Sequence, residues 1–235
     1  MTVDSPQQDG EADVNISVFI ASLGNPPPHD QSRHSAGHIL LKALQSHLGL
    51  PAFRRSRPFA NGLISEGQVA DNVNIALWQC PASMNESGDA VAKAYRQFVS
   101  SSTETTKSQV GGGKGANDGW PTLVVLYDEM EITPGLLKVG PGSASAKGHN
   151  GLKSVQQSLK TTGLMGRMVA AEKKKNDGSN MFLKVRFGIG RPPGATRKKE
   201  DVAAFVLGQL PDSEVEQLGS CAEELMDLLE EEIMK

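Results

Sequence analysis

Apolar segments of strand length alternate along this chain with longer segments whose apolar residues recur at helical spacing, and this alternation restricts its fold more than any other feature. The strand-like segments are residues 15–21, 73–78, 122–127, 135–139 and 181–189. Helical spacing follows over residues 32–48, 85–98, 148–159, 200–209 and 212–235. Strands separated by helices form a sheet with helices packed on its faces. We therefore predict an α/β fold, a single-domain three-layer αβα sandwich around a mixed β-sheet.

The domain boundaries follow from changes in composition. Residues 1–14 are polar and acidic and predict a disordered tail. We expect residues 15–235 to form one domain, because a chain of 235 residues has the length of a single domain. Ser/Thr-rich and Gly-rich residues at about 100–120, and polar residues at 171–180, predict two flexible insertions.

Several classes of protein do not fit this sequence. No apolar run approaches the roughly 20 residues that cross a bilayer, so we expect no membrane association. The acidic amino terminus resembles neither a secretory signal nor a mitochondrial presequence. Cys80 and Cys221 lie far apart and form no CxxC motif, which indicates a reduced intracellular protein. We expect a cytoplasmic location, with the mitochondrion left open, and no metal site.

The charge distribution is asymmetric along the chain. Residues 138–199 hold 14 Lys or Arg against two acids, whereas residues 200–235 hold 11 acids and one Lys. A basic sector inside an acidic protein suits a polyphosphate partner, because phosphate contacts dominate affinity for nucleic acid. By itself, the charge is more typical of a solvated surface.

Polar residues follow four of the apolar elements, at Asn25, His34, Asn85 and Asp128, and His149 and Asn150 begin a later helix. In open α/β sheets, ligands bind where strand ends and helix N-termini converge. Taken singly, each of these residues is an ordinary turn or cap residue.

Taken together and in this order, the blocks resemble the signature of bacterial-type peptidyl-tRNA hydrolases. The resemblance covers about residues 16–218 and rests on Leu23–Pro26, Arg33–Gly37, Met84–Gly88, Asp128, Gly148–Leu152, Phe187–Pro192 and Phe205–Leu207. Ser35 and Ser83 differ from the residues usual in the family and put some substrate contacts in doubt.

The resemblance implies a monomeric enzyme that cleaves the ester between a peptide and the 3′ ribose of tRNA, without metal or other cofactor. His34 is then the general base and Asp128 fixes its tautomer. The resemblance also assigns substrate binding to neutral amides and to a Met that lines the peptide channel, at Asn25, Met84, Asn85 and Asn150. A Met in the core is the alternative for Met84, and His149 either joins the site or only shapes its turn.

Candidate phosphate contacts come from the basic sector, with Lys184 and Arg186 on one face of the 181–189 strand, opposite the apolar face. The full set is Lys138, Lys147, Lys153, Lys184 and Arg186. A solvated basic face is the alternative.

The sequence speaks against two rival functions and leaves a third open. A serine hydrolase would carry a GxSxG elbow, and a dinucleotide-binding protein a GxGxxG turn after its first strand; neither motif is present. A non-catalytic RNA-binding protein on the same fold remains, although such a scaffold has no need for both His34 and Asp128.

Overall fold

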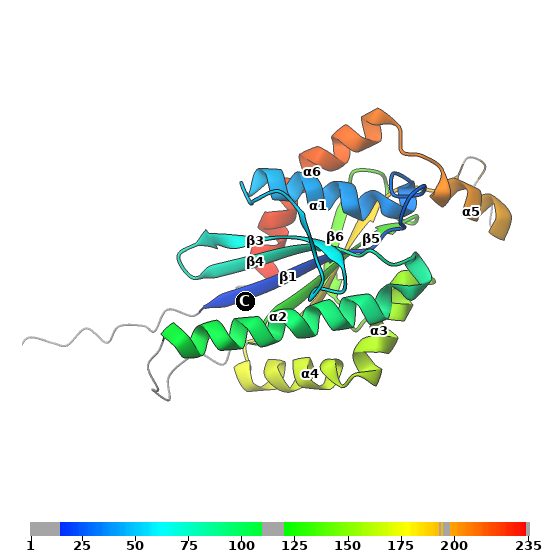
Figure 1. Cartoon of the computed structure of the whole chain (residues 1–235). Coiled ribbons are helices and arrows are strands. Elements are labelled where there is room, and N and C mark those ends of the chain that lie inside the picture. Colours follow the sequence, from blue (N-terminus) through cyan, green and yellow to red (C-terminus); the bar gives the residue numbers. More distant parts are fainter. Residues whose placement is uncertain (1–14, 110–119, 193, 195–197, 234–235) are drawn as a thin grey trace, which may run out of the picture.

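The computed structural model describes residues 15–109, 120–192, 194 and 198–233. A seven-stranded sheet crosses the molecule in the order β2-β3-β4-β1-β5-β7-β6 (Figure 1). The strands are β1 Ile16–Ser22, β2 Arg54–Ser56, β3 Gly62–Ala70, β4 Val73–Gln79, β5 Thr122–Glu129, β6 Leu137–Pro141 and β7 Phe182–Gly188. The central strands β4, β1, β5 and β7 run parallel, while β2, β3 and β6 pair antiparallel at the two sides. The sheet is therefore mixed.

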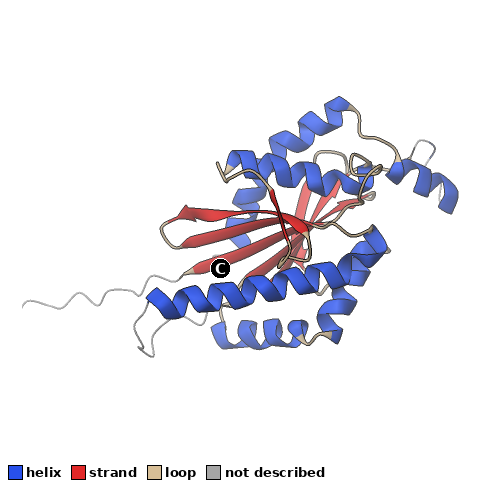
Figure 2. Cartoon of the chain, in the orientation of Figure 1, coloured by secondary structure: helices blue, strands red, loops and turns tan. Residues whose placement is uncertain are grey.

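Helices cover both faces of the sheet, as Figures 1 and 2 show. On one face lie α1 Ala36–His47 and α6 Asp212–Ile233. On the other lie α2 Ser87–Gln109, α3 Asn150–Thr161 and α4 Leu164–Lys175. The short helix α5 Lys199–Leu207 lies to one side of these layers. The predicted single-domain three-layer αβα sandwich is confirmed.

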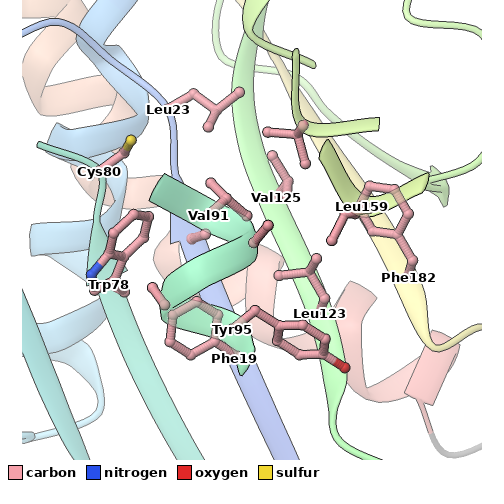
Figure 3. Packing of buried hydrophobic residues seen from close by; sticks show 14 of the residues in the cluster. Phe19, Leu23, Trp78, Cys80, Val91, Tyr95, Leu123, Val125, Leu159 and Phe182 are labelled. Carbon is pink, nitrogen blue, oxygen red and sulfur yellow. The ribbon is translucent and has the colours of Figure 1, made fainter. Parts of the chain in front are cut away.

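A hydrophobic core lies on each face of the sheet, between the strands and the helices. The central strands are apolar on both faces, as parallel strands covered by helices require. Along β1, Phe19 packs toward α2 while Ile20 packs toward α1. Phe19 contacts Trp78 and Tyr95, with ring centroids 5.9 and 6.0 Å apart (Figure 3). Successive side chains of one strand thus pack against the helices on both faces of the sheet.

Several elements differ from the expectations. Strands β2 and β3 and helix α4 add to the predicted set. Helix α2 continues through Gln109 and α4 through Lys175, so residues 100–109 and 171–175 are helical where flexible insertions were expected. Their Ala, Glu, Lys and Gln residues allow a helix to continue. The tail at 1–14 and residues 110–119 of the first predicted insertion lie outside the described residues.

Two residues depart from the pattern of their neighbouring elements. Met181 belongs to the core under α2, whereas Leu183, Val185 and Phe187 belong to the opposite core. Met181 precedes β7 and so does not follow the alternation of that strand. Ser32 does not cap the following helix, because its hydroxyl donates to the carbonyl of His29 instead.

No helix within the described residues is long and apolar enough to span a bilayer.

Candidate active site

The predicted site residues gather at the carboxyl edge of the parallel strands. The 3₁₀ helix η1 (Arg33–Ser35) follows β1, and the 3₁₀ helix η2 (Met84–Glu86) follows β4. Asp128 lies near the end of β5, and α3 begins at Asn150. Because β1 pairs with both β4 and β5, the segments that follow these strands meet at one place on the sheet edge.

Helix η1 contacts the carboxyl-terminal part of the chain. The Arg33 guanidinium lies 3.0 Å from a Glu214 carboxylate oxygen and 4.6 Å from the centroid of the Phe205 ring. The Arg33 backbone N–H donates to the carbonyl of Gly208 at 3.0 Å. These contacts fix the residue that precedes His34.

His34 and Asp128 form a direct hydrogen bond. Nδ1 of His34 lies 2.8 Å from Oδ1 of Asp128, and the Asp128 side chain is 3% exposed while that of His34 is 19% exposed. A carboxylate only accepts, so Nδ1–H of neutral His34 donates and Nε2 keeps its lone pair. Nε2 is therefore the ring nitrogen that can take a proton.

His149 joins this pair through the same carboxylate oxygen. Its Nδ1 accepts the backbone N–H of Leu152 at 3.2 Å, which caps α3. In the neutral ring the proton is then on Nε2, which lies 3.2 Å from Oδ1 of Asp128 and donates to it. The rings of His34 and His149 are 5.1 Å apart between centroids. The sequence leaves the role of His149 open, and the place of this residue in the Gly148–Leu152 block is its only signal of a role in the site.

The electrostatics favour a charged Asp128 beside a basic His34. Burial raises the pKa of Asp128, but the His34 charge and the hydrogen bonds from both histidines outweigh it and hold the pKa well below its usual range. Burial lowers the pKa of His34, and the Asp128 charge and hydrogen bond outweigh burial, so that this pKa is raised above 6.5. The carboxylate thus makes the imidazole a stronger base.

The same three side chains have the composition of a metal site. His34, Asp128 and His149 each offer one ligand atom, and these atoms lie within 4.8 Å of one another. Oδ1 of Asp128 already accepts a hydrogen bond from each of the two histidine rings, so this oxygen has partners without an ion. The same arrangement can also support acid–base chemistry at His34.

Asn25 is oriented by its neighbours. Its Oδ1 accepts the backbone N–H of Met84 at 3.0 Å, and its own backbone N–H donates to Oγ of Ser35 at 2.9 Å. Because the side-chain oxygen is engaged by a donor, the amide NH₂ group is the end directed to other partners. It is the only side-chain donor that Asn25 can offer to a substrate.

Asn85 and Asn150 are exposed and line a polar groove of about 670 Å³ between α2 and α3. Met84 differs from the expectation of a channel residue. It is 4% exposed and belongs to the core under α2. Gly151 gives it room, since a Cβ there would lie 2.3 Å from Sδ of Met84. The core alternative is favoured because this packing leaves little of Met84 for substrate.

The basic candidates divide into three groups. Lys138 and Arg186 are direct cross-strand partners on β6 and β7, and Nε of Arg186 is buried with no hydrogen-bond partner in the described residues. Lys147 and Lys153 are exposed. Lys184 is 4% exposed, and its ammonium donates to the carbonyls of Ala144 and Ser145 at 2.9 and 2.8 Å. These bonds tie Lys184 to the 144–145 segment, and its phosphate contact stays a prediction.

Known proteins place this chain in a family. The family model described as peptidyl-tRNA hydrolase matches residues 19–107 and 172–235. The peptidyl-tRNA hydrolase of Geotalea uraniireducens is 32% identical over 213 residues, covering 90% of this chain and 87% of that protein. The enzyme of Rhodococcus opacus is 28% identical over 215 residues, covering 91% and 90%.

A solved structure agrees in fold. The crystal structure of peptidyl-tRNA hydrolase from Acinetobacter baumannii superposes with a TM-score of 0.60 at 22% identity, covering 95% of this chain and 92% of that one. The family model matches more than half of the chain, and the relatives span nearly all of it. The chain therefore belongs to the peptidyl-tRNA hydrolase family.

Proposed function

We propose that this protein hydrolyses the ester bond that joins a peptide, or an N-blocked amino acid, to the 3′ ribose of tRNA, without a metal ion. The observation that carries the proposal is the hydrogen bond of His34 to the buried Asp128 at 2.8 Å. An imidazole held in one tautomer with its other nitrogen free is the form that general-base catalysis needs.

The reaction begins with a water molecule at Nε2 of His34. The imidazole takes a proton from water as the oxygen bonds to the ester carbonyl carbon, and the imidazolium that forms is stabilised by Asp128. The tetrahedral intermediate then expels the ribose oxygen, which receives that proton from His34. The products are tRNA with its terminal hydroxyl restored and a free peptide carboxylic acid, which then ionises by releasing its proton to solvent.

The neutral amides orient the substrate in this proposal. The NH₂ group of Asn25 donates to the ester or to the oxyanion that develops from it, a contact that stabilises the transition state more than the ground state. Asn85 and Asn150 contact the peptide part from the groove that they line. An amide does this without adding a charge that competes with Asp128.

The tRNA part is held by phosphate contacts. Lys138 and Arg186 lie side by side on β6 and β7, and Lys147 and Lys153 add exposed charge. Such contacts supply affinity that falls with salt. We further propose that the protein acts as a monomer in the cytoplasm, which sedimentation of the purified chain and localisation of a tagged copy test.

The test is release of an N-acetylated amino acid from tRNA with EDTA present, comparing wild type with His34→Ala. We expect release by wild type and a loss on the order of a hundredfold or more in the folded variant. His47→Ala is the matched control, because His47 is exposed at the end of α1. If wild type binds tRNA but releases nothing, the protein is instead a non-catalytic RNA-binding member of the fold.

A further inference from the structure

A polar groove of about 670 Å³ adjoins the candidate active site between the first turns of α2 and α3. One side is formed by η2 and α2, the other by α3, and its lining includes Asn85, Glu86, Asp89, Asn150, Lys153 and Gln157. Asn85 and Asn150 belong both to the candidate site and to this groove. A substrate held at His34 can therefore extend into it.

The walls of the groove are held together at short range. The backbone N–H of Gly88 donates to Oγ of Ser154 at 3.0 Å, and a Cβ on Gly88 would lie 2.2 Å from the carbonyl oxygen of Ser154. One turn further along α3, the Ser158 hydroxyl donates to Asp89 at 2.6 Å. The small Gly88 thus lets α2 and α3 approach closely beside the groove, and these contacts hold the two helices together.

The ester substrate has two parts, a peptide arm and a tRNA arm. The chemistry of the residues that line the groove distinguishes between them. The groove offers amides, hydroxyls and two carboxylates and has no aromatic side chain on which a base could stack. Glu86 and Asp89 repel phosphates, whereas Lys138 and Arg186, on β6 and β7, attract them. Asn and Gln side chains instead suit the N–H and C=O groups of an extended peptide.

We propose that this groove binds the peptide arm and that Glu86 and Asp89 select peptides carrying a cationic group, either a Lys or Arg side chain or a free α-amino group. Lys153 is the one cation among the lining residues, so the lining carries a net negative charge. This inference rests on the proposed function and adds a peptide preference to it.

The experiment compares tripeptides attached to one tRNA that differ only in the middle residue, Lys, Gln or Glu, with the amino end acetylated. A fourth substrate has Gln and a free amino end, which separates the two sources of positive charge. For wild type we expect kcat/KM to be about three- to tenfold higher with Lys than with Glu, as exposed charge pairs allow. The ratio should shrink as salt is raised.

Charge-neutral variants assign the preference to the groove. In Glu86→Gln/Asp89→Asn the Lys-to-Glu ratio should fall to within about twofold, since the near-isosteric amides remove only the two negative charges. Asp71→Asn is the matched control, because Asp71 is exposed beside Val73, at the opposite end of β4 from Gln79. An unchanged ratio in the double variant overturns the inference. An equal rise in kcat/KM for every peptide also overturns it and places an RNA strand in the groove.

A second readout separates this inference from the proposed function. The same tripeptides joined to tRNA through a non-hydrolysable amide give dissociation constants without any chemistry. The Lys-over-Glu order in Kd, together with no hydrolysis of the esters, would overturn the proposed function alone. Hydrolysis of all esters with no order in kcat/KM or Kd would overturn the inference alone.

Discussion

Nδ1 of His34 lies 2.8 Å from Oδ1 of Asp128, although 94 residues separate the two in the sequence. Their strands are neighbours, with Ser22 of β1 opposite Leu126 of β5, and the Leu23 N–H donates to the carbonyl of Leu126. The contact between base and carboxylate therefore follows from strand pairing. Four expectations about function and stability follow from this and related contacts.

The pH dependence of hydrolysis should report the pKa of His34. Only the neutral imidazole accepts a proton, so kcat/KM should rise with pH and level off above an apparent pKa that lies higher than 6.5. Asp128→Asn removes the charge that raises this pKa, so the midpoint should move to lower pH while the plateau falls at least about a hundredfold. A pH–rate profile of both proteins tests this. A midpoint that does not move would show that another group is titrating.

Asn25 variants separate its two hydrogen-bonding roles. Asn25→Asp keeps the oxygen that accepts from the Met84 N–H but loses the NH₂ donor and adds a charge, so kcat should fall about tenfold to a thousandfold. The free energy of unfolding should change little. Asn25→Ala loses both roles and should lower stability as well as kcat. Kinetics and urea unfolding of the two variants check this, and an Asp variant with wild-type kcat would remove Asn25 from the reaction.

Lys138 and Arg186 should act on tRNA affinity and not on the chemical step. Replacing either with Gln should raise KM for tRNA substrates, leave kcat within about twofold, and reduce the slope of log Kd against log salt by about one. Lys42→Gln is the control, because Lys42 is exposed on α1, the opposite helical layer from α3. The affinity for tRNA, measured at several salt concentrations, tests this prediction. An unchanged salt slope in both variants would show that these cations lie outside the tRNA contact.

His38 should make the protein less stable in mild acid. It is 2% exposed, its Nδ1 lies 2.7 Å from Oγ of Ser22, and burial together with the Lys42 charge lowers its pKa to about 3. Between pH 6.5 and that value the unfolded chain binds a proton that the folded chain does not. Stability should therefore fall with decreasing pH by about 1.4 kcal/mol per pH unit from this group.

The measurement for His38 is urea unfolding across this pH range for wild type and His38→Gln. The variant should show the shallower dependence on pH, whatever its stability at neutral pH. Equal slopes would mean that His38 is protonated in the folded state. Gly24 explains the tight fit of this ring, because a Cβ there would lie 2.3 Å from its Nε2.

Elements with strong apolar patterning were predictable, and those whose placement depends on partners were not. The runs of β1, β4 and β5 are buried on both faces, so composition alone marks them as strands. The strands β2 and β3 are polar or mixed; β3 forms because it pairs with β4, and the edge strand β2 forms because it pairs with β3. Helix α4 buries only Leu164 and Met168, too few residues to give a clear helical pattern.

The sequence by itself determined the order of strands and helices, the position of polar residues at strand ends, and the residues that carry the resemblance to the family. These are local properties, set by periodicity and by turn chemistry. The tertiary structure decided which polar side chains act together. It placed His149 against Asp128 and formed the groove between α2 and α3. It also buried Lys184, whose ammonium binds backbone carbonyls, and buried Met84 in the core. Burial and contact between residues far apart in sequence depend on how the layers pack, and no local pattern encodes that packing.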